Sequence, residues 1–98
     1  MIIRLVKFKS ALSDSEVLER YEQRAPQYRT LSGLLQKYYI KDRQTGEHGA
    51  VYIWDSLQSM KGFEQSELSR SIPEAYQIIG QPRIEILDLV YALRPEKH

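Results

Sequence analysis

The stretch GLLQKYYIKDRQTGEHGAVYIWDS, residues 33–56, predicts a β-hairpin. Two largely apolar arms, Leu34 to Lys41 and Ala50 to Asp55, flank a polar turn. Gly46 stands where a type I turn followed by a G1 bulge needs a left-handed residue. The turn therefore sets the register of the two arms.

Aromatic and aliphatic side chains fall on both faces of this hairpin. Side chains alternate along a strand, so Tyr52 and Trp54 share one face while Val51 and Ile53 take the other. A sheet with one face in water alternates apolar with polar residues. Both faces of this hairpin therefore need a cover.

The rest of the chain supplies helices for one face. Its pattern predicts a strand at 2–9 and then a helix that begins at a Ser13–Glu16 capping box. This helix is expected to kink or stop at Pro26, with a further turn through residues 28–31. After the hairpin, the pattern predicts a second helix that begins near Asp55-Ser56, consists of two pieces joined near 67–71 and is stopped by Gly80, followed by a strand at 83–93. A second capping box is expected at Ser71–Glu74. With right-handed crossovers, this β-α-β-β-α-β order gives the α+β class and a ferredoxin-like, four-stranded antiparallel sheet. Residues 1–94 are expected to form one domain and residues 95–98 a flexible tail.

A second copy of the chain is the predicted cover for the outer face of the sheet. Five or six large side chains there, at about 1.5–3 kcal/mol each when buried, favour association by about 10 kcal/mol before the cost of association. The sequence therefore predicts a homodimer through the sheet face.

Composition excludes several classes of function. The net charge is +1 and no basic run is present, which argues against nucleic-acid binding. The absence of cysteine excludes disulfides and thiol chemistry, and two lone histidines without ligand spacing predict no metal site. The first ten residues have no signal-peptide pattern, and no stretch is long enough to span a membrane. A cytoplasmic protein with no membrane contact is expected.

The hairpin resembles that of the small dimeric α+β-barrel proteins related to the antibiotic-biosynthesis monooxygenases. The matching segments are Ser32-Gly33-Leu34, Lys37-Tyr38-Tyr39, the turn Thr45-Gly46-Glu47-His48-Gly49-Ala50, and Val51-Tyr52-Ile53-Trp54. Ser32 replaces the usual Pro and Ala50 a Gly. The resemblance implies a dimeric α+β barrel and a monooxygenase that needs no cofactor, because the deprotonated aromatic substrate reacts directly with dioxygen. The chain contains no Asn, a residue that characterised relatives often place in the pocket.

A pocket for a small aromatic or quinol-type ligand is predicted between the helices and the sheet. The residues expected to form it are Tyr21, Tyr28, Tyr52, Trp54, Phe63 and Tyr76. The alternative is that these side chains are plain core. The broken second helix is the expected gate of the pocket.

Three residues are weak candidates for catalysis. His48 is a base that reaches over the pocket mouth or the partner subunit, or it is a solvated residue beside the turn. Arg24 holds an anionic oxygen or lies on the solvated face of its helix. Asp88 is a buried base with a raised pKa, or a residue at an edge or in a salt bridge across the dimer.

Three functions remain open from the sequence. The first is a cofactor-independent monooxygenase, and the second is a dimer that binds or senses a small molecule without turnover. The third is another reaction on the same barrel, such as isomerisation of a small lactone.

Overall fold

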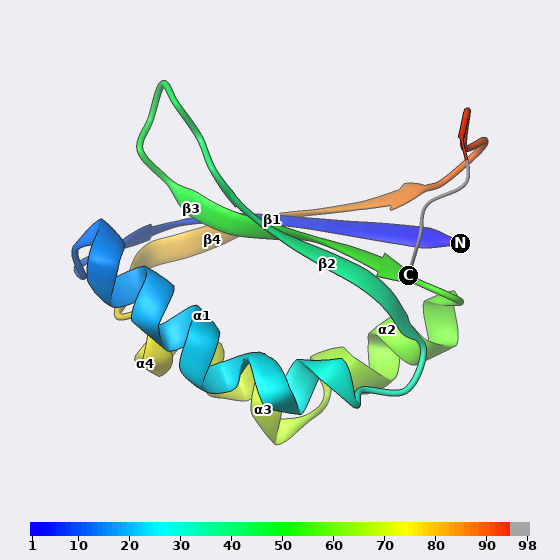
Figure 1. The fold of residues 1–98 in the computed structure, drawn as a ribbon, viewed down its shortest axis with the longest axis horizontal. Coiled ribbons are helices and arrows are strands. Elements are labelled where there is room, and N and C mark those ends of the chain that lie inside the picture. The colour runs from blue at the N-terminus through cyan, green and yellow to red at the C-terminus, as the bar shows by residue number, and fades with distance from the viewer. Residues whose placement is uncertain (95–98) are drawn as a thin grey trace.

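The computed structural model describes residues 1–94. Its elements are β1 (Ile2–Ser10), α1 (Asp14–Arg29), β2 (Leu34–Lys41), β3 (His48–Trp54), α2 (Leu57–Glu64), α3 (Glu67–Arg70), α4 (Ile72–Ala75) and β4 (Ile78–Asp88). The strands pair antiparallel in the order β2-β3-β1-β4, and the helices all lie on one face of the sheet (Figure 1). This confirms the predicted ferredoxin-like α+β fold. The predicted tail at 95–98 lies outside the described residues.

Helix α1 begins as predicted and is continuous through Pro26. Ser13 and Glu16 form a complete capping box at its start. A stop at Pro26 is excluded, because α1 continues to Arg29, within the further turn that was expected after the proline. Proline removes the hydrogen bond to the carbonyl of Glu22, and this residue is exposed, so water can take the proline's place. Tyr28, buried in the core, anchors the last turn.

The second helical region consists of three short helices rather than two. Ser56 caps α2 and Ser66 caps α3 through their hydroxyl groups. The predicted joint at 67–71 is therefore itself a helical turn, α3. The predicted cap at Ser71 is wrong, because its hydroxyl donates to the carbonyl of Leu68 instead.

Strand β4 lies five residues earlier than predicted. Its start at Ile78 pairs with Ser10, and Gly80, at φ +72°, stays inside the strand rather than stopping a helix. The strand ends at Asp88, which pairs with Ile2, the first residue of β1, and the N–H of Leu89 makes one further hydrogen bond to the carbonyl of Met1 at 3.0 Å. The boundary is therefore set by the neighbouring strand, which a local pattern does not show.

The hairpin register agrees with the alternation in the sequence. Gly46 has φ +76°, and its N–H donates to the carbonyl of Asp42 at 2.9 Å. Tyr52 and Trp54 face the helices and belong to the core, where the side chain of Trp54 is fully buried. The outer face carries eight apolar side chains, namely Ile3, Leu5, Tyr38, Ile40, Val51, Ile53, Ile79 and Leu87.

Candidate functional site

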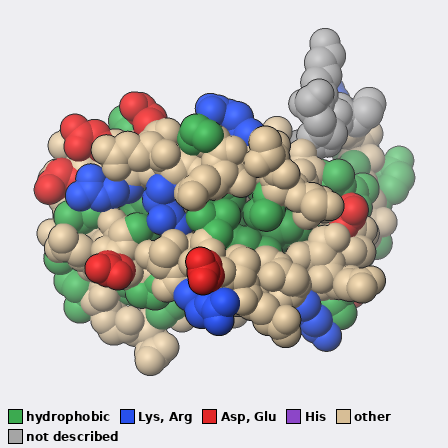
Figure 2. All heavy atoms as spheres, turned by 90° about the horizontal axis from the view of Figure 1, so that it is seen from below, with side chains coloured by type: hydrophobic (Ala, Val, Ile, Leu, Met, Phe, Trp, Pro, Cys, Tyr) green, Lys and Arg blue, Asp and Glu red, His purple; other side chains and the backbone are tan. Residues whose placement is uncertain are grey.

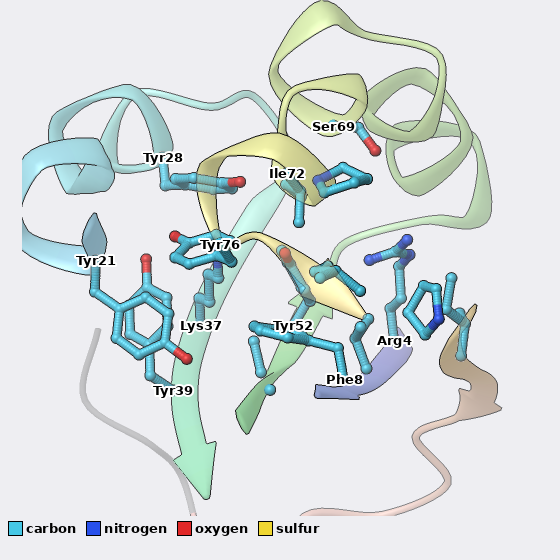
Figure 3. A pocket seen from close by; sticks show the side chains of 17 residues that line it. Arg4, Phe8, Tyr21, Tyr28, Lys37, Tyr39, Tyr52, Ser69, Ile72 and Tyr76 are labelled. Atoms are coloured by element: carbon cyan, nitrogen blue, oxygen red, sulfur yellow. The ribbon is translucent and has the colours of Figure 1, made fainter. Parts of the chain in front are cut away.

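A cavity of about 170 Å³ lies between the helices and the sheet, where the sequence placed the pocket. All four strands contribute to it, together with α1 and the α3–α4 region (Figure 3). Ser69, Ile72 and Pro73 line it from α3 and α4, so the broken helical region forms part of its wall. Seen from the helix side, hydrophobic side chains show between bands of polar atoms (Figure 2).

Four of the six predicted pocket residues line this cavity. Tyr21 and Tyr28 come from α1, Tyr52 comes from β3, and Tyr76 follows α4. They lie up to 55 residues apart in the sequence, and the fold brings them together around the cavity (Figure 3). Contact of any of them with a ligand remains a prediction.

Trp54 and Phe63 lie behind the wall rather than in it. The Trp54 ring stacks on the Tyr52 ring with centroids 6.0 Å apart and an angle of 8°. Phe63 packs against both, with centroids 5.4 Å from each. The two residues therefore support Tyr52, and the expectation that they form the cavity surface is corrected.

His48 lies away from the cavity. Its side chain is buried at the start of β3, and Nε2 is 3.1 Å from Oδ1 of Asp14 at the beginning of α1. The ring of Phe8 lies beside it, with centroids 6.4 Å apart. His48 is thus neither a solvated turn residue nor a member of the cavity wall, because its hydrogen-bond partner Asp14 holds it against the start of α1.

Arg24 and Asp88 also stay outside the cavity lining. Arg24 is partly buried rather than solvated, and its Nη2 donates to the carbonyl of Leu68 at 3.2 Å and to the hydroxyl of Ser71 at 3.1 Å. These bonds join α1 to the α3–α4 region. Asp88 is exposed at the end of β4, an edge strand, as the simpler interpretation held.

Among the cavity-wall residues that the sequence interpretation missed, three bear on the chemistry of the site: Arg4, Lys37 and Tyr39. The alternation of side chains along the strands already indicated that Arg4 and Lys37 face the helices. Arg4 pairs with Tyr52 across β1 and β3, and Lys37 pairs with Tyr52 across β2 and β3, so both point to the helix side. Inward-facing positions of a core strand are normally apolar. Charged residues at such positions are exceptions, and exceptions of this kind are concentrated at functional sites.

The cation of Arg4 is neutralised by a neighbour. Its Nε lies 3.2 Å from Oε2 of Glu64 on α2, and its guanidinium lies over the rings of Tyr52 and Phe63 at 5.3 and 5.5 Å. The Arg4 side chain is only 7% exposed. Arg4 is therefore a fixed, paired part of the wall.

Lys37 is the second cation of the cavity wall, and no ion pair among residues 1–94 includes it. Burial, with smaller effects from Arg24 and Arg4, lowers the pKa of the Lys37 ammonium to about 7. Both its charged and its neutral form are then present near neutral pH. An amine of this kind can exchange a proton with a ligand.

Four tyrosine hydroxyls of the cavity wall remain protonated at neutral pH. Burial raises the pKa of Tyr39 to about 12, and it also raises those of Tyr21, Tyr52 and Tyr76. Among the described residues, the hydroxyls of Tyr21, Tyr28 and Tyr76 are buried without a hydrogen-bond partner. Buried polar groups are normally paired, so these hydroxyls are available to a ligand.

The size of the cavity limits its ligand. An apolar cavity of about 150 Å³ holds a benzene molecule. A cavity of about 170 Å³ therefore accepts one substituted aromatic ring. A fused tricyclic compound requires the wall to move.

Two further features of residues 1–94 bear on the class of protein. No three His, Asp or Glu side chains gather there in a group that could hold a metal ion. No helix within this range has the length and apolar character to cross a membrane.

Comparison with known proteins identifies the fold. A scan against protein-family models and a search of the curated proteins found no match to this sequence. Solved structures do match over nearly the whole chain. The cofactor-independent oxygenase SnoaB from Streptomyces nogalater has a TM-score of 0.75 at 8% identity, covering 96% of this chain and 97% of its own.

Two other structures give the same result. The monooxygenase from the gene ActVA-Orf6 of Streptomyces coelicolor, solved with the ligand nanaomycin D, has a TM-score of 0.73 at 17% identity, covering 97% of this chain and 92% of its own. A proposed antibiotic biosynthesis monooxygenase from Deinococcus radiodurans has a TM-score of 0.74 at 17% identity. The match covers 99% of this chain and 100% of the Deinococcus chain. The chain therefore has the fold of the antibiotic biosynthesis monooxygenases, as the hairpin resemblance implied.

Proposed function

We propose that this protein is a cofactor-independent monooxygenase that acts on a phenol or quinol with one aromatic ring. The observation that carries the proposal is the cavity itself. It has an aromatic wall, room for one ring, and a lysine without an acidic partner. Structural neighbours that are cofactor-independent oxygenases support the reaction class.

The chemistry needs no group beyond substrate and dioxygen. A hydroquinone, C₆H₆O₂, and one O₂ give a hydroxybenzoquinone, C₆H₄O₃, and one water. The substrate alone supplies the electrons that reduce both oxygen atoms. The protein must favour the electron-rich phenolate, hold it in a dry site, and admit dioxygen.

Residues of this chain can fill these roles. The rings of Tyr28, Tyr39 and Tyr52 provide flat apolar surfaces for a substrate ring. The unpaired hydroxyls of Tyr28 and Tyr76 can donate hydrogen bonds to an anionic oxygen. The α3–α4 region, built from two helices of four residues each, is the proposed gate for entry.

Dioxygen uptake tests this proposal. The protein, shown free of flavin and metal, is incubated with a panel of monocyclic hydroquinones and with tricyclic anthrones. We expect uptake above the uncatalysed rate with the hydroquinones, and less with the anthrones because of the size of the cavity. No acceleration with any member of the panel would contradict the proposed function.

Binding without turnover is the second candidate function. One observation favours it: none of the three predicted catalytic residues, His48, Arg24 and Asp88, lines the cavity. Tight binding of hydroquinones without dioxygen uptake supports this candidate against the first.

We also propose that a second copy of the chain covers the outer face of the sheet. The support is the apolar character of that face, where Leu87 is 47% exposed and Tyr38 is 45% exposed. Exposed apolar surface of this extent is unusual on a monomer. A cytoplasmic location stays a prediction from the cysteine-free sequence.

A further inference from the structure

Lys37 has surroundings unlike those of the other lysines that the structure describes. Its Nζ lies 3.4 Å from the centre of the Tyr28 ring, 4.5 Å from that of Tyr52 and 4.6 Å from that of Tyr39. The three rings come from α1, β3 and β2, and they surround the amine on the floor of the cavity (Figure 3). Lys7 and Lys41, in contrast, form ion pairs with carboxylates.

Among residues 1–94, the charged and titratable groups that face Lys37 include no carboxylate. From α1 these are Tyr28 and Arg24, from β1 Arg4, from β3 Tyr52, and from β2 Tyr39. No Asp or Glu of the described residues lines the cavity. The arginines disfavour the ammonium form, while the ring faces favour it. The site thus lacks an anion next to Lys37, and a ligand can provide one.

The geometry points to Lys37 as the base that ionises the substrate. We propose that a phenol binds in its neutral form and transfers its hydroxyl proton to Nζ of Lys37. The O–H bond of the phenol breaks and an N–H bond of the ammonium forms, so charge is conserved within the cavity. The phenolate then lies beside the ammonium, where the hydroxyls of Tyr28 and Tyr76 can donate to its oxygen. This inference rests on the proposed function and names its substrate class, a weakly acidic phenol.

A role as a base explains why Lys37 is surrounded by aromatic rings and has no carboxylate partner. A carboxylate partner would hold Lys37 permanently protonated. The three rings stabilise the ammonium only modestly and do not fix its charge. The proton can therefore move to Lys37 when a phenol binds and leave it when the product departs.

Binding of 3-nitrophenol tests the proposal without any need for turnover. Its phenolate absorbs visible light and its phenol does not. The titration is made just above pH 7, where most of the free probe is protonated. We expect wild-type protein to produce the phenolate band, and to release less than about half a proton per bound probe, because more than half of Lys37 is neutral there. Calorimetry in two buffers of different ionisation enthalpy counts the released protons.

Three variants separate the roles of the amine. Lys37→Met is expected to lose the phenolate band and to bind the phenolate at least tenfold more weakly. Lys37→Arg keeps a cation that cannot accept a proton, so it is expected to keep the band and to release about one proton per bound probe. Lys41→Met, a change on the same face of β2, is the matched control and is expected to behave as wild type.

The possible failures are distinct. If wild-type protein binds the probe without a phenolate band, or if Lys37→Met keeps the band, Lys37 is not the base, although the pocket stands. If neither 3-nitrophenol nor any hydroquinone binds, the proposed function fails as well. Should the variants not fold, NMR of the Lys37 side chain in wild-type protein decides: the proposal requires its ε-carbon signal to move to the ammonium position when the probe binds.

Discussion

The rings of Tyr52 and Trp54 stack with an interplanar angle of 8° and centroids 6.0 Å apart. Tyr52 lines the cavity, and Trp54 lies directly behind it. Because Trp54 is the only tryptophan of the chain, its emission reports on the wall of the cavity. We predict that hydroquinone binding shifts or quenches this emission in a saturable way, as measured by fluorescence titration.

The cavity-filling variant Ala50→Leu provides the control. Ala50 lines the cavity from β3, so a larger side chain there occupies the space of the ligand. Ala50→Leu is expected to remove the fluorescence change while leaving the circular dichroism spectrum intact. Unaltered emission in wild-type protein that calorimetry shows to be saturated with ligand would contradict the position assigned to the ligand.

The lowered pKa of Lys37 predicts a pH-dependent stability. In the unfolded chain the lysine has its ordinary pKa, 10.5, and in the folded protein it has a pKa of about 7. Between these values the unfolded state binds more protons, so the free energy of unfolding of the wild type, relative to that of Lys37→Met, rises with pH. The expected gain between pH 7 and 9 is about 2 kcal/mol.

Denaturant unfolding of the two proteins at several pH values measures this difference. The range stays below pH 10, where the buried tyrosines begin to add their own contribution of opposite sign. Lys41→Met is the control, and it is expected to show no such gain. A difference between wild type and Lys37→Met that does not change with pH would mean that Lys37 keeps its ordinary pKa in the folded state.

Two glycines of the hairpin have unequal roles. At Gly46 a side chain meets no atom within 4 Å, so Gly46→Ala carries only the backbone cost of φ +76°, about 1 kcal/mol. At Gly49 a Cβ would lie within 2 Å of the carbonyl oxygen of Val6 on the paired strand, so β1 and β3 must separate. We predict a modest fall in melting temperature for Gly46→Ala and a much larger loss of stability for Gly49→Ala. Equal melting temperatures for the two variants would contradict the register of β1 and β3.

The proposed dimer interface is tested by a charge on the outer face. Ile53 also belongs to this face, but it is unsuitable because it is only 7% exposed in the single chain, and a charge there would unfold the protomer. Leu87→Glu is preferable, since Leu87 is 47% exposed on β4. We predict that it weakens association in sedimentation while the protomer stays folded.

Leu18→Glu on α1 serves as the matched control for the dimer. Leu18 is 56% exposed, but it lies in the helical layer rather than on the outer face of the sheet. It is expected to leave association unchanged. If the wild type sediments as an 11.5 kDa species at micromolar concentration, no dimer forms through this face.

The parts of this fold that could be predicted are those governed by local patterns. The hairpin followed from alternation and one turn glycine, and the start of α1 followed from a capping box. The end of β4 was misplaced because it depends on where β1 begins, a relationship between residues distant in the sequence. The continuity of α1 through Pro26 likewise depends on solvent access to Glu22.

The candidate site shows a similar division. Inward-facing tyrosines were found because aromatic residues on the apolar face of an element are an obvious pattern. Lys37 was missed because a lysine in a strand is ordinarily read as a surface residue. Its register with Tyr52 on β3 placed it inward, and that register was already implied by the turn. The burial of His48 was not foreseeable, since its partner Asp14 lies at the start of another element.

The most direct test of the central claim compares dioxygen uptake by three proteins with the same monocyclic hydroquinone. They are the wild type, Ala50→Leu, which fills the cavity, and Ala11→Leu, which makes the same change at an exposed position. If the reaction takes place in this cavity, the wild type and Ala11→Leu consume dioxygen at equal rates, and Ala50→Leu loses at least tenfold while remaining folded. Equal rates for all three proteins would show that the reaction does not take place in this cavity.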